Sequence, residues 1–93
     1  MDLGIKAKLA IVTGSTAGIG YAVAEALVRE GASVVVNGRT PARVEAAIAR
    51  VREAVPGART EGHIEGVAAD VSTAEGCARL IAAHPDADIL VNN

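Results

Sequence analysis

Aromatic residues are nearly absent from this 93-residue chain, which has one tyrosine and neither phenylalanine nor tryptophan. Its hydrophobic content of 51% therefore comes mainly from alanine, valine, isoleucine and leucine. Short aliphatic side chains of this kind suit parallel strands that helices bury on both faces. The lack of aromatic rings also removes the stacking surfaces with which many proteins bind single-stranded nucleic acids.

Cysteine and clustered positive charge are scarce as well. A single cysteine excludes an internal disulfide and favours a reducing compartment. The net charge of −2 includes no basic block, which argues against nucleic acid or an anionic membrane as a partner. No apolar run approaches the roughly 20 residues of a membrane span. The N-terminus does not resemble a secretion signal, so a cytoplasmic location is expected.

Apolar, β-branched runs alternate along the chain with stretches of helical spacing. Strands are predicted at about 7–13, 33–37, 66–69 and 89–91, with one helix in each interval and a polar loop at 59–65. Crossovers of this length return the chain parallel to the preceding strand, and they are right-handed. The predicted fold class is therefore α/β, the N-terminal portion of a Rossmann-type doubly wound parallel sheet with four strands in the order 3-2-1-4 and three helices.

The helix ends carry recognisable signals. The first helix is predicted over 18–30, with Gly31 after its last turn. Its apolar positions 19, 22, 23, 26 and 27 follow helical spacing. Thr40 and Pro41 predict the N-cap and first turn of the second helix. Its apolar stripe comprises Val44, Ile48, Val51 and Val55.

The third helix is predicted from a capping-box match, Ser72-Thr73-Ala74-Glu75. Cys77, Leu80 and Ile81 are expected to point inward. His84-Pro85 ends the helix, because a residue that precedes proline avoids helical dihedrals.

The stretch Thr13-Gly14-Ser15-Thr16-Ala17-Gly18-Ile19-Gly20 joins the first strand to the first helix. A helix N-terminus offers free backbone N–H groups and the positive end of the helix dipole. Glycines there allow the backbone to approach a phosphate, because no Cβ intervenes. The stretch thus predicts a site for a nucleotide pyrophosphate, the alternative being a glycine-rich turn without a ligand.

Asn37-Gly38-Arg39 ends the second strand, where dinucleotide-binding folds contact the adenine ribose. A carboxylate there binds the free 2′-hydroxyl, whereas an arginine favours a 2′-phosphate. Here the acid is absent and Arg39 is present, which favours NADP(H) and leaves NAD(H) as the alternative. Ser15 is a further candidate for contact with that phosphate. Arg39 could instead be a solvated loop charge.

Thr13-Gly14-x-x-x-Gly18-Ile19-Gly20, together with Asp70-Val71 and Asn92-Asn93, resembles the cofactor site of the short-chain dehydrogenase/reductase family. The resemblance covers the whole chain but only the N-terminal part of the family's domain. It implies that Asp70 and Val71 lie beside the adenine and Asn92 beside the adenosine ribose. Read without the resemblance, Asp70 is equally a loop acid beside a helix start.

The resemblance further implies a partner set: a nicotinamide dinucleotide, a small carbonyl or alcohol substrate that exchanges a hydride with it, and a homo-oligomeric intact enzyme. The family's serine, Tyr-x-x-x-Lys pair and further asparagine do not match this chain. Its one tyrosine, Tyr21, is followed four residues later by Glu25, and no lysine follows Lys8.

Residues 1–93 are therefore interpreted as a truncated, dinucleotide-binding segment of a single-domain oxidoreductase, inactive by itself and without a catalytic residue of its own. The alternatives are a non-catalytic nucleotide-binding module and an inactive fragment. His63 and His84 are isolated and suggest no metal site. The predicted cofactor-binding residues are Thr13, Gly14, Ser15, Thr16, Gly18, Ile19, Gly20, Asn37, Arg39, Asp70, Val71 and Asn92.

Overall fold

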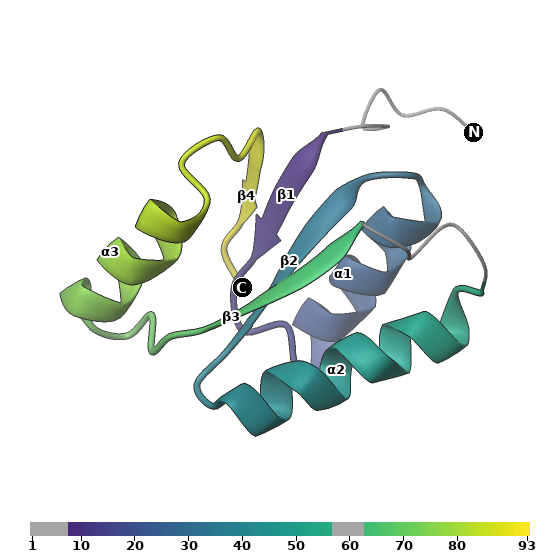
Figure 1. Ribbon diagram of the computed structural model, residues 1–93, viewed down its shortest axis with the longest axis horizontal. Helices are drawn as coiled ribbons and strands as arrows, with labels where there is room; N and C mark the ends of the chain where they lie inside the picture. The colour runs from purple at the N-terminus through teal and green to yellow at the C-terminus, as the bar shows by residue number, and fades with distance from the viewer. Residues whose placement is uncertain (1–7, 57–62) are drawn as a thin grey trace.

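The computed structural model describes residues 8–56 and 63–93 (Figure 1). Within these ranges strands and helices alternate strictly, as predicted. The elements are β1 (Leu9–Val12), α1 (Gly18–Arg29), β2 (Ser33–Gly38), α2 (Pro41–Ala54), β3 (Ile64–Ala68), α3 (Ala74–Ala83) and β4 (Ile89–Val91). The bounds of β4 agree with the prediction. Residue 7, predicted to begin the first strand, and residues 59–62, predicted as loop, lie outside the described ranges.

The four strands form one parallel sheet in the order β3-β2-β1-β4, which confirms the predicted Rossmann-type topology. Val12 at the end of β1 is paired with Val36 of β2 on one side and with Val91 of β4 on the other. Because all strands run the same way, their carboxyl ends meet at one edge of the sheet. The loops that follow β1, β2, β3 and β4 therefore lie together there.

Helices α1 and α2 cover one face of the sheet and α3 lies on the other (Figure 1). The larger core cluster, on the first face, includes Val12, Val34, Val36, Val28 of α1 and Val51 of α2. The smaller cluster joins Ile11 and Val35 of the sheet to Leu80 of α3. Strand residues alternate between the clusters, as the period of two requires. No helix in residues 8–56 or 63–93 combines the length and apolarity that a membrane span requires.

The apolar spacing of α1 marks its buried face only in part: Val23 and Leu27 pack against the larger core cluster. The buried residues of the helix are Gly20, Tyr21, Ala24 and Val28, while Ile19 is 77% exposed. Alanine and valine occupy so many positions of this helix that apolar spacing alone does not fix its orientation. Tyr21 is buried, with its hydroxyl donating to Glu25 Oε1 (2.9 Å) and the Arg50 guanidinium 4.0 Å from its ring centroid.

The prediction for α2 is confirmed. Thr40 is the N-cap, its hydroxyl accepting a hydrogen bond from the Arg43 N–H (3.3 Å), and Pro41 occupies the first turn. Val44, Val51 and Val55 are buried, and Ile48 packs against the same cluster.

Two expectations for α3 are wrong. Its N-cap is Thr73, whose hydroxyl accepts from the Gly76 N–H (3.0 Å), because the Ser72 hydroxyl donates to Asp70 instead. Leu80 points inward as expected, but Cys77 and Ile81 are exposed. The buried stripe is narrow, since it consists of Gly76 and Leu80 on one side of the helix.

Strand β3 begins two residues earlier than predicted. Ile64 and Glu65 pair with Val34 and Val35 of β2, so these two residues are strand rather than loop. Glu65 is polar because β3 is an edge strand and its side chain is exposed. The start of this exposed edge strand is as polar as a loop, which is why the sequence predicted a loop there.

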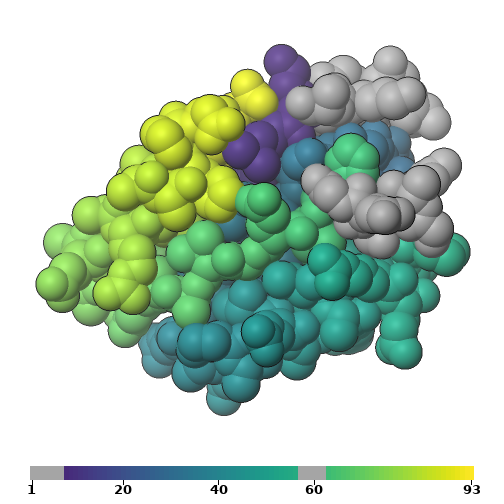
Figure 2. Space-filling view, viewed as in Figure 1, coloured from purple at the N-terminus to yellow at the C-terminus, as the bar shows by residue number. Residues whose placement is uncertain are grey.

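The other edge strand, β4, is apolar. The Val91 carbonyl accepts from the Thr13 N–H (3.0 Å), so alternation along the strand turns the N–H and C=O of Leu90 away from β1. The Leu90 side chain is 60% exposed, and the segment reaches the molecular surface (yellow, Figure 2). An apolar edge without lysine or proline is a template for pairing with another chain.

We therefore expect the 93-residue chain to self-associate at micromolar concentration through β4. Size-exclusion chromatography with light scattering measures this directly. Leu90→Lys places a charge on the edge and should shift the population toward monomer, whereas Ile81→Lys changes an equally exposed apolar residue away from the strand. A parent chain that is monomeric at all concentrations tested would contradict the expectation.

Candidate functional site

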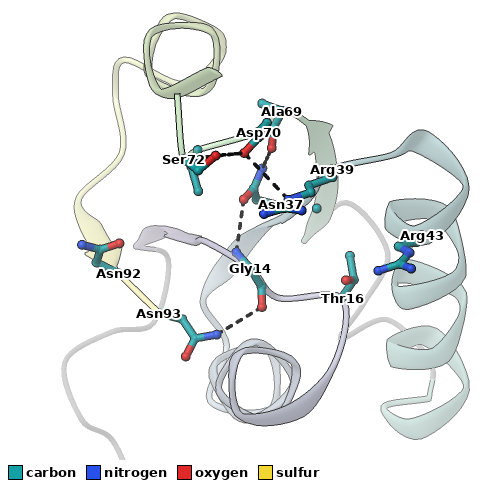
Figure 3. Close-up of a pocket in the computed structure, with 12 residues that line it drawn as sticks. Gly14, Thr16, Asn37, Arg39, Arg43, Ala69, Asp70, Ser72, Asn92 and Asn93 are labelled. Carbon is teal, nitrogen blue, oxygen red and sulfur yellow. Dashed lines mark hydrogen bonds and ion pairs between the residues drawn. The ribbon is translucent and has the colours of Figure 1, made fainter. Parts of the chain in front are cut away.

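A cavity of about 450 Å³ opens at the carboxyl ends of the strands (Figure 3). It brings together the loops after β1, β2 and β3 and the residues after β4. Seven predicted site residues line it: Gly14, Thr16, Asn37, Arg39, Asp70, Val71 and Asn92. Gly38, Arg43, Ala69, Ser72 and Asn93 complete the lining. The volume lies in the usual range for small-molecule sites.

Two glycines of the loop after β1 have left-handed backbone dihedrals. The φ angles of Gly14 and Gly18 are 56° and 61°, a region that residues with a Cβ enter only at a cost of about 1–2 kcal/mol. A Cβ on Gly18 would meet no atom within 4 Å beyond its chain neighbours and its own helix backbone, so the space beside it is open. Helix α1 begins at Gly18 after Ala17, whose side chain has no cap acceptor. Its first N–H groups can therefore serve an anion.

Gly20 has a different role from the other two glycines. A Cβ there would overlap the Gly14 carbonyl and lie 2.7 Å from Asn93 Nδ2. The missing side chain thus lets the loop pack against the helix, and this contact is internal to the protein. Thr13 and Ser15 of the same loop are buried and do not line the cavity.

Asn37 joins three segments beneath the cavity. Its Oδ1 accepts from the Gly14 N–H (3.1 Å), and its Nδ2 donates to the carbonyls of Val67 (3.1 Å) and Ala69 (3.2 Å). Its backbone N–H donates to Ser15 Oγ (2.9 Å), and that hydroxyl donates to the Val12 carbonyl (2.7 Å). The Ser15 hydroxyl therefore lies between backbone groups of β1 and β2.

Thr13 and the two terminal asparagines fix the loop to the end of β4. Thr13 Oγ1 accepts from the Asn93 N–H (3.0 Å) and lies 3.3 Å from Asn92 Oδ1. Asn93 Nδ2 donates to the Gly14 carbonyl (3.2 Å). Gly14 is consequently held on both sides, by Asn37 and by Asn93.

The charged residues of the lining are Arg39, Arg43 and Asp70, which leave it with a net positive charge. Arg39 Nε lies 3.8 Å from Asp70 Oδ1, and the two side chains are 74% and 44% exposed. An ion pair this exposed contributes little stability. Hydrogen bonds from the Ser72 hydroxyl (2.6 Å) and N–H (3.0 Å) hold the pKa of the Asp70 carboxyl below its usual value, and Arg39 lowers it further.

Sequence reasoning missed Arg43. It lies in the first turn of α2, and its side chain is directed toward the Thr16 side of the cavity (Figure 3). A cation in the first turn of a helix is unfavourable for the helix dipole. The positive charge of Arg43 at the positive end of the α2 dipole was therefore a signal in the sequence. It follows directly after the strand end that is expected to contact the ribose, and it could have identified Arg43 as a site residue.

The other chemically reactive side chains have structural partners. His63 Nδ1 lies 3.3 Å from Ser33 Oγ, and His84 Nε2 lies 3.4 Å from Glu65 Oε2. The Cys77 thiol donates to the Val71 carbonyl (3.1 Å). Among the residues that the structure describes, no three histidine, cysteine or acidic side chains gather as a metal site would require.

Comparisons with known proteins agree with this geometry. A family described as short chain dehydrogenase matches residues 8–93. Two oxidoreductases of Bacillus subtilis, YvaG and YvrD, both named as uncharacterized, are 43% and 44% identical over the full chain. The chain spans 34% of the length of each. The crystal structure of L-sorbose reductase from Gluconobacter frateurii, complexed with NADPH and L-sorbose, matches all of this chain and 35% of its own with a TM-score of 0.85 and 38% identity.

Proposed function

Because this chain belongs to the short-chain dehydrogenase family, we propose that it forms the part of a nicotinamide dinucleotide site that binds the adenosine and the pyrophosphate, with NADP(H) preferred over NAD(H). The chain spans about a third of the length of the curated relatives it matches. Hydride transfer between the nicotinamide and a carbonyl or alcohol is accordingly proposed for a protein of the relatives' length.

The observation that best supports the preference for NADP(H) is the positively charged cavity at the end of β2. Arg39 and Arg43 line it, and Asn37-Gly38 stand where an acid would select NAD(H). Guanidinium groups match phosphate oxygens in both charge and geometry. The NADPH bound in the structure of L-sorbose reductase supports the same preference.

The glycine loop supports the pyrophosphate position. Open space beside Gly18 adjoins the uncapped N-terminus of α1, which satisfies the steric and electrostatic needs of a phosphate. Asp70 and Val71 then border the adenine, and Asn92 borders its ribose. The bound dinucleotide would supply the hydride, while these residues hold its adenosine half.

A nucleotide-binding module without catalysis is the second candidate function for the 93 residues alone. The one tyrosine, Tyr21, is buried with its hydroxyl on Glu25. Burial, followed by that hydrogen bond, raises the pKa of Tyr21. Its hydroxyl is therefore poorly placed to exchange a proton with a substrate.

Arg39→Ala tests the cofactor preference. We expect the dissociation constant of NADPH to rise about ten- to a hundredfold, because a hydrogen bond to a charged group contributes about 1.5–3 kcal/mol. The constant for NADH should change little. Arg52→Ala removes the same charge from an exposed position in the last turn of α2 and serves as the control. Equal affinities of the parent chain for NADPH and NADH in isothermal titration would refute the preference.

A further inference from the structure

The side chain of Asn37 lies at the carboxyl end of β2, and only 1% of the residue is exposed. From the proposed function alone it would be expected to contact the ligand's ribose. We infer instead that Asn37 is a positioning residue: its amide sets the glycine loop and the β3–α3 turn at the spacing that the dinucleotide requires. This inference rests on the proposed function.

The chemistry of the amide fits its three partners. The carbonyl oxygen Oδ1 accepts from one N–H group, and the two hydrogens of Nδ2 are donated to two carbonyls. Figure 3 shows the contacts with Gly14 and Ala69. Both donors are used within the protein, so the side chain presents no free N–H to the cavity. Aspartate has nearly the same shape but would set a carboxylate against the carbonyls of Val67 and Ala69.

The three bonds connect opposite sides of the cavity. Gly14 belongs to the loop proposed for the pyrophosphate, and Ala69 directly precedes Asp70, the acid proposed beside the adenine. Asn37 also precedes Gly38 and Arg39, so one residue relates all three ligand-facing segments. A site held in place before its ligand arrives binds more tightly, because less ordering remains to be done on binding.

The hydrogen bonds of Asn37 also hold the glycine loop in one conformation. Gly14 has a left-handed φ, and Asn37 holds its N–H while Asn93 holds its carbonyl. Because Asn37 is itself anchored by the Ser15 hydroxyl, the side chain and backbone of one asparagine fix two consecutive loop residues.

The first test uses Asn37→Ala, which removes the acceptor for Gly14 and both donors and adds no charge beside the ligand's phosphates. We expect NADPH and NADH to lose affinity by the same factor, about tenfold or more. Hydrogen exchange of the Gly14 amide should also accelerate, and this does not depend on any ligand. A residue that contacted the ribose would change the ratio of the two affinities, because the two cofactors differ at the ribose 2′ position.

The second test uses the parent chain and does not depend on whether the variant folds. Without ligand, the side-chain amide protons of Asn37 should exchange with solvent more slowly than those of the exposed Asn92. Exchange as fast as that of Asn92, or a changed affinity ratio in Asn37→Ala, would overturn the inference. A parent chain that bound neither cofactor but retained slow exchange at Asn37 would refute the proposed function and leave the hydrogen-bonded arrangement intact.

Discussion

Replacing Gly18 by valine is expected to abolish dinucleotide binding while the sheet remains folded. The valine side chain would occupy the open space beside the start of α1, where the pyrophosphate is proposed to lie. Loss of two hydrogen bonds from N–H groups to a charged phosphate, at about 1.5–3 kcal/mol each, corresponds to about a hundredfold or more in the dissociation constant. Isothermal titration with NADPH measures the loss, and circular dichroism follows the fold.

Backbone strain is the competing explanation, because the φ of Gly18 is positive. Gly31→Val is the matched control. Gly31 also has a positive φ, 92°, but lies just after the opposite end of α1. Both variants should lose thermal stability, and only the valine at position 18 should lose binding. If Gly18→Val bound NADPH like the parent, the pyrophosphate would lie elsewhere.

The 93-residue chain is expected to show no oxidation of NADPH above background with a panel of aldehydes and ketones. Carbonyl reduction needs a group that delivers a proton, and a positioned general acid accelerates such reactions about 10²–10⁴-fold. Tyr21 is buried against Glu25, and no lysine follows Lys8 in the sequence. Under the proposed function, the described residues would hold the adenosine half of the cofactor, and another part of a longer protein would supply the proton.

Absorbance at the nicotinamide band measures this activity, and a complete short-chain dehydrogenase assayed with the same panel serves as the positive control. Turnover that scales with the concentration of the 93-residue chain would contradict the expectation. Because binding is measured separately, the absence of turnover in a chain that binds NADPH would favour the module over the inactive fragment.

The sheet order was predictable because two general rules act on a visible pattern. Runs such as Val34-Val35-Val36 and Ile89-Leu90-Val91 mark strands, and right-handed crossovers then leave few topologies. The capping signals at Thr40 and Pro41 were equally local, and the structure confirms both. Where apolar residues occupy most positions, as in α1, the sequence carries too little contrast to orient the helix.

The candidate site was predictable only in part. Gly14, Arg39 and Asp70 stand at strand ends, so their meeting at one edge followed from the topology. The role of Asn37 depends on the carbonyls of Val67 and Ala69, which lie 30 and 32 residues away in the sequence. No local sequence pattern indicates contacts between residues this far apart. Arg43 reaches the cavity because α2 begins beside it. Such placements are properties of the tertiary structure.

The pairing of β1 with β4 has a consequence for the order in which this molecule assembles. The Gly14–Asn37 hydrogen bond joins residues 23 positions apart, whereas Thr13 and Asn93 are separated by 80. Closing the longer loop carries the larger entropic cost, and contacts between distant residues slow folding. We expect β1, α1 and β2 to form a native-like nucleus first, with β4 docking last. Ligand competence would then appear as a late kinetic phase, after most of the helical signal has already developed.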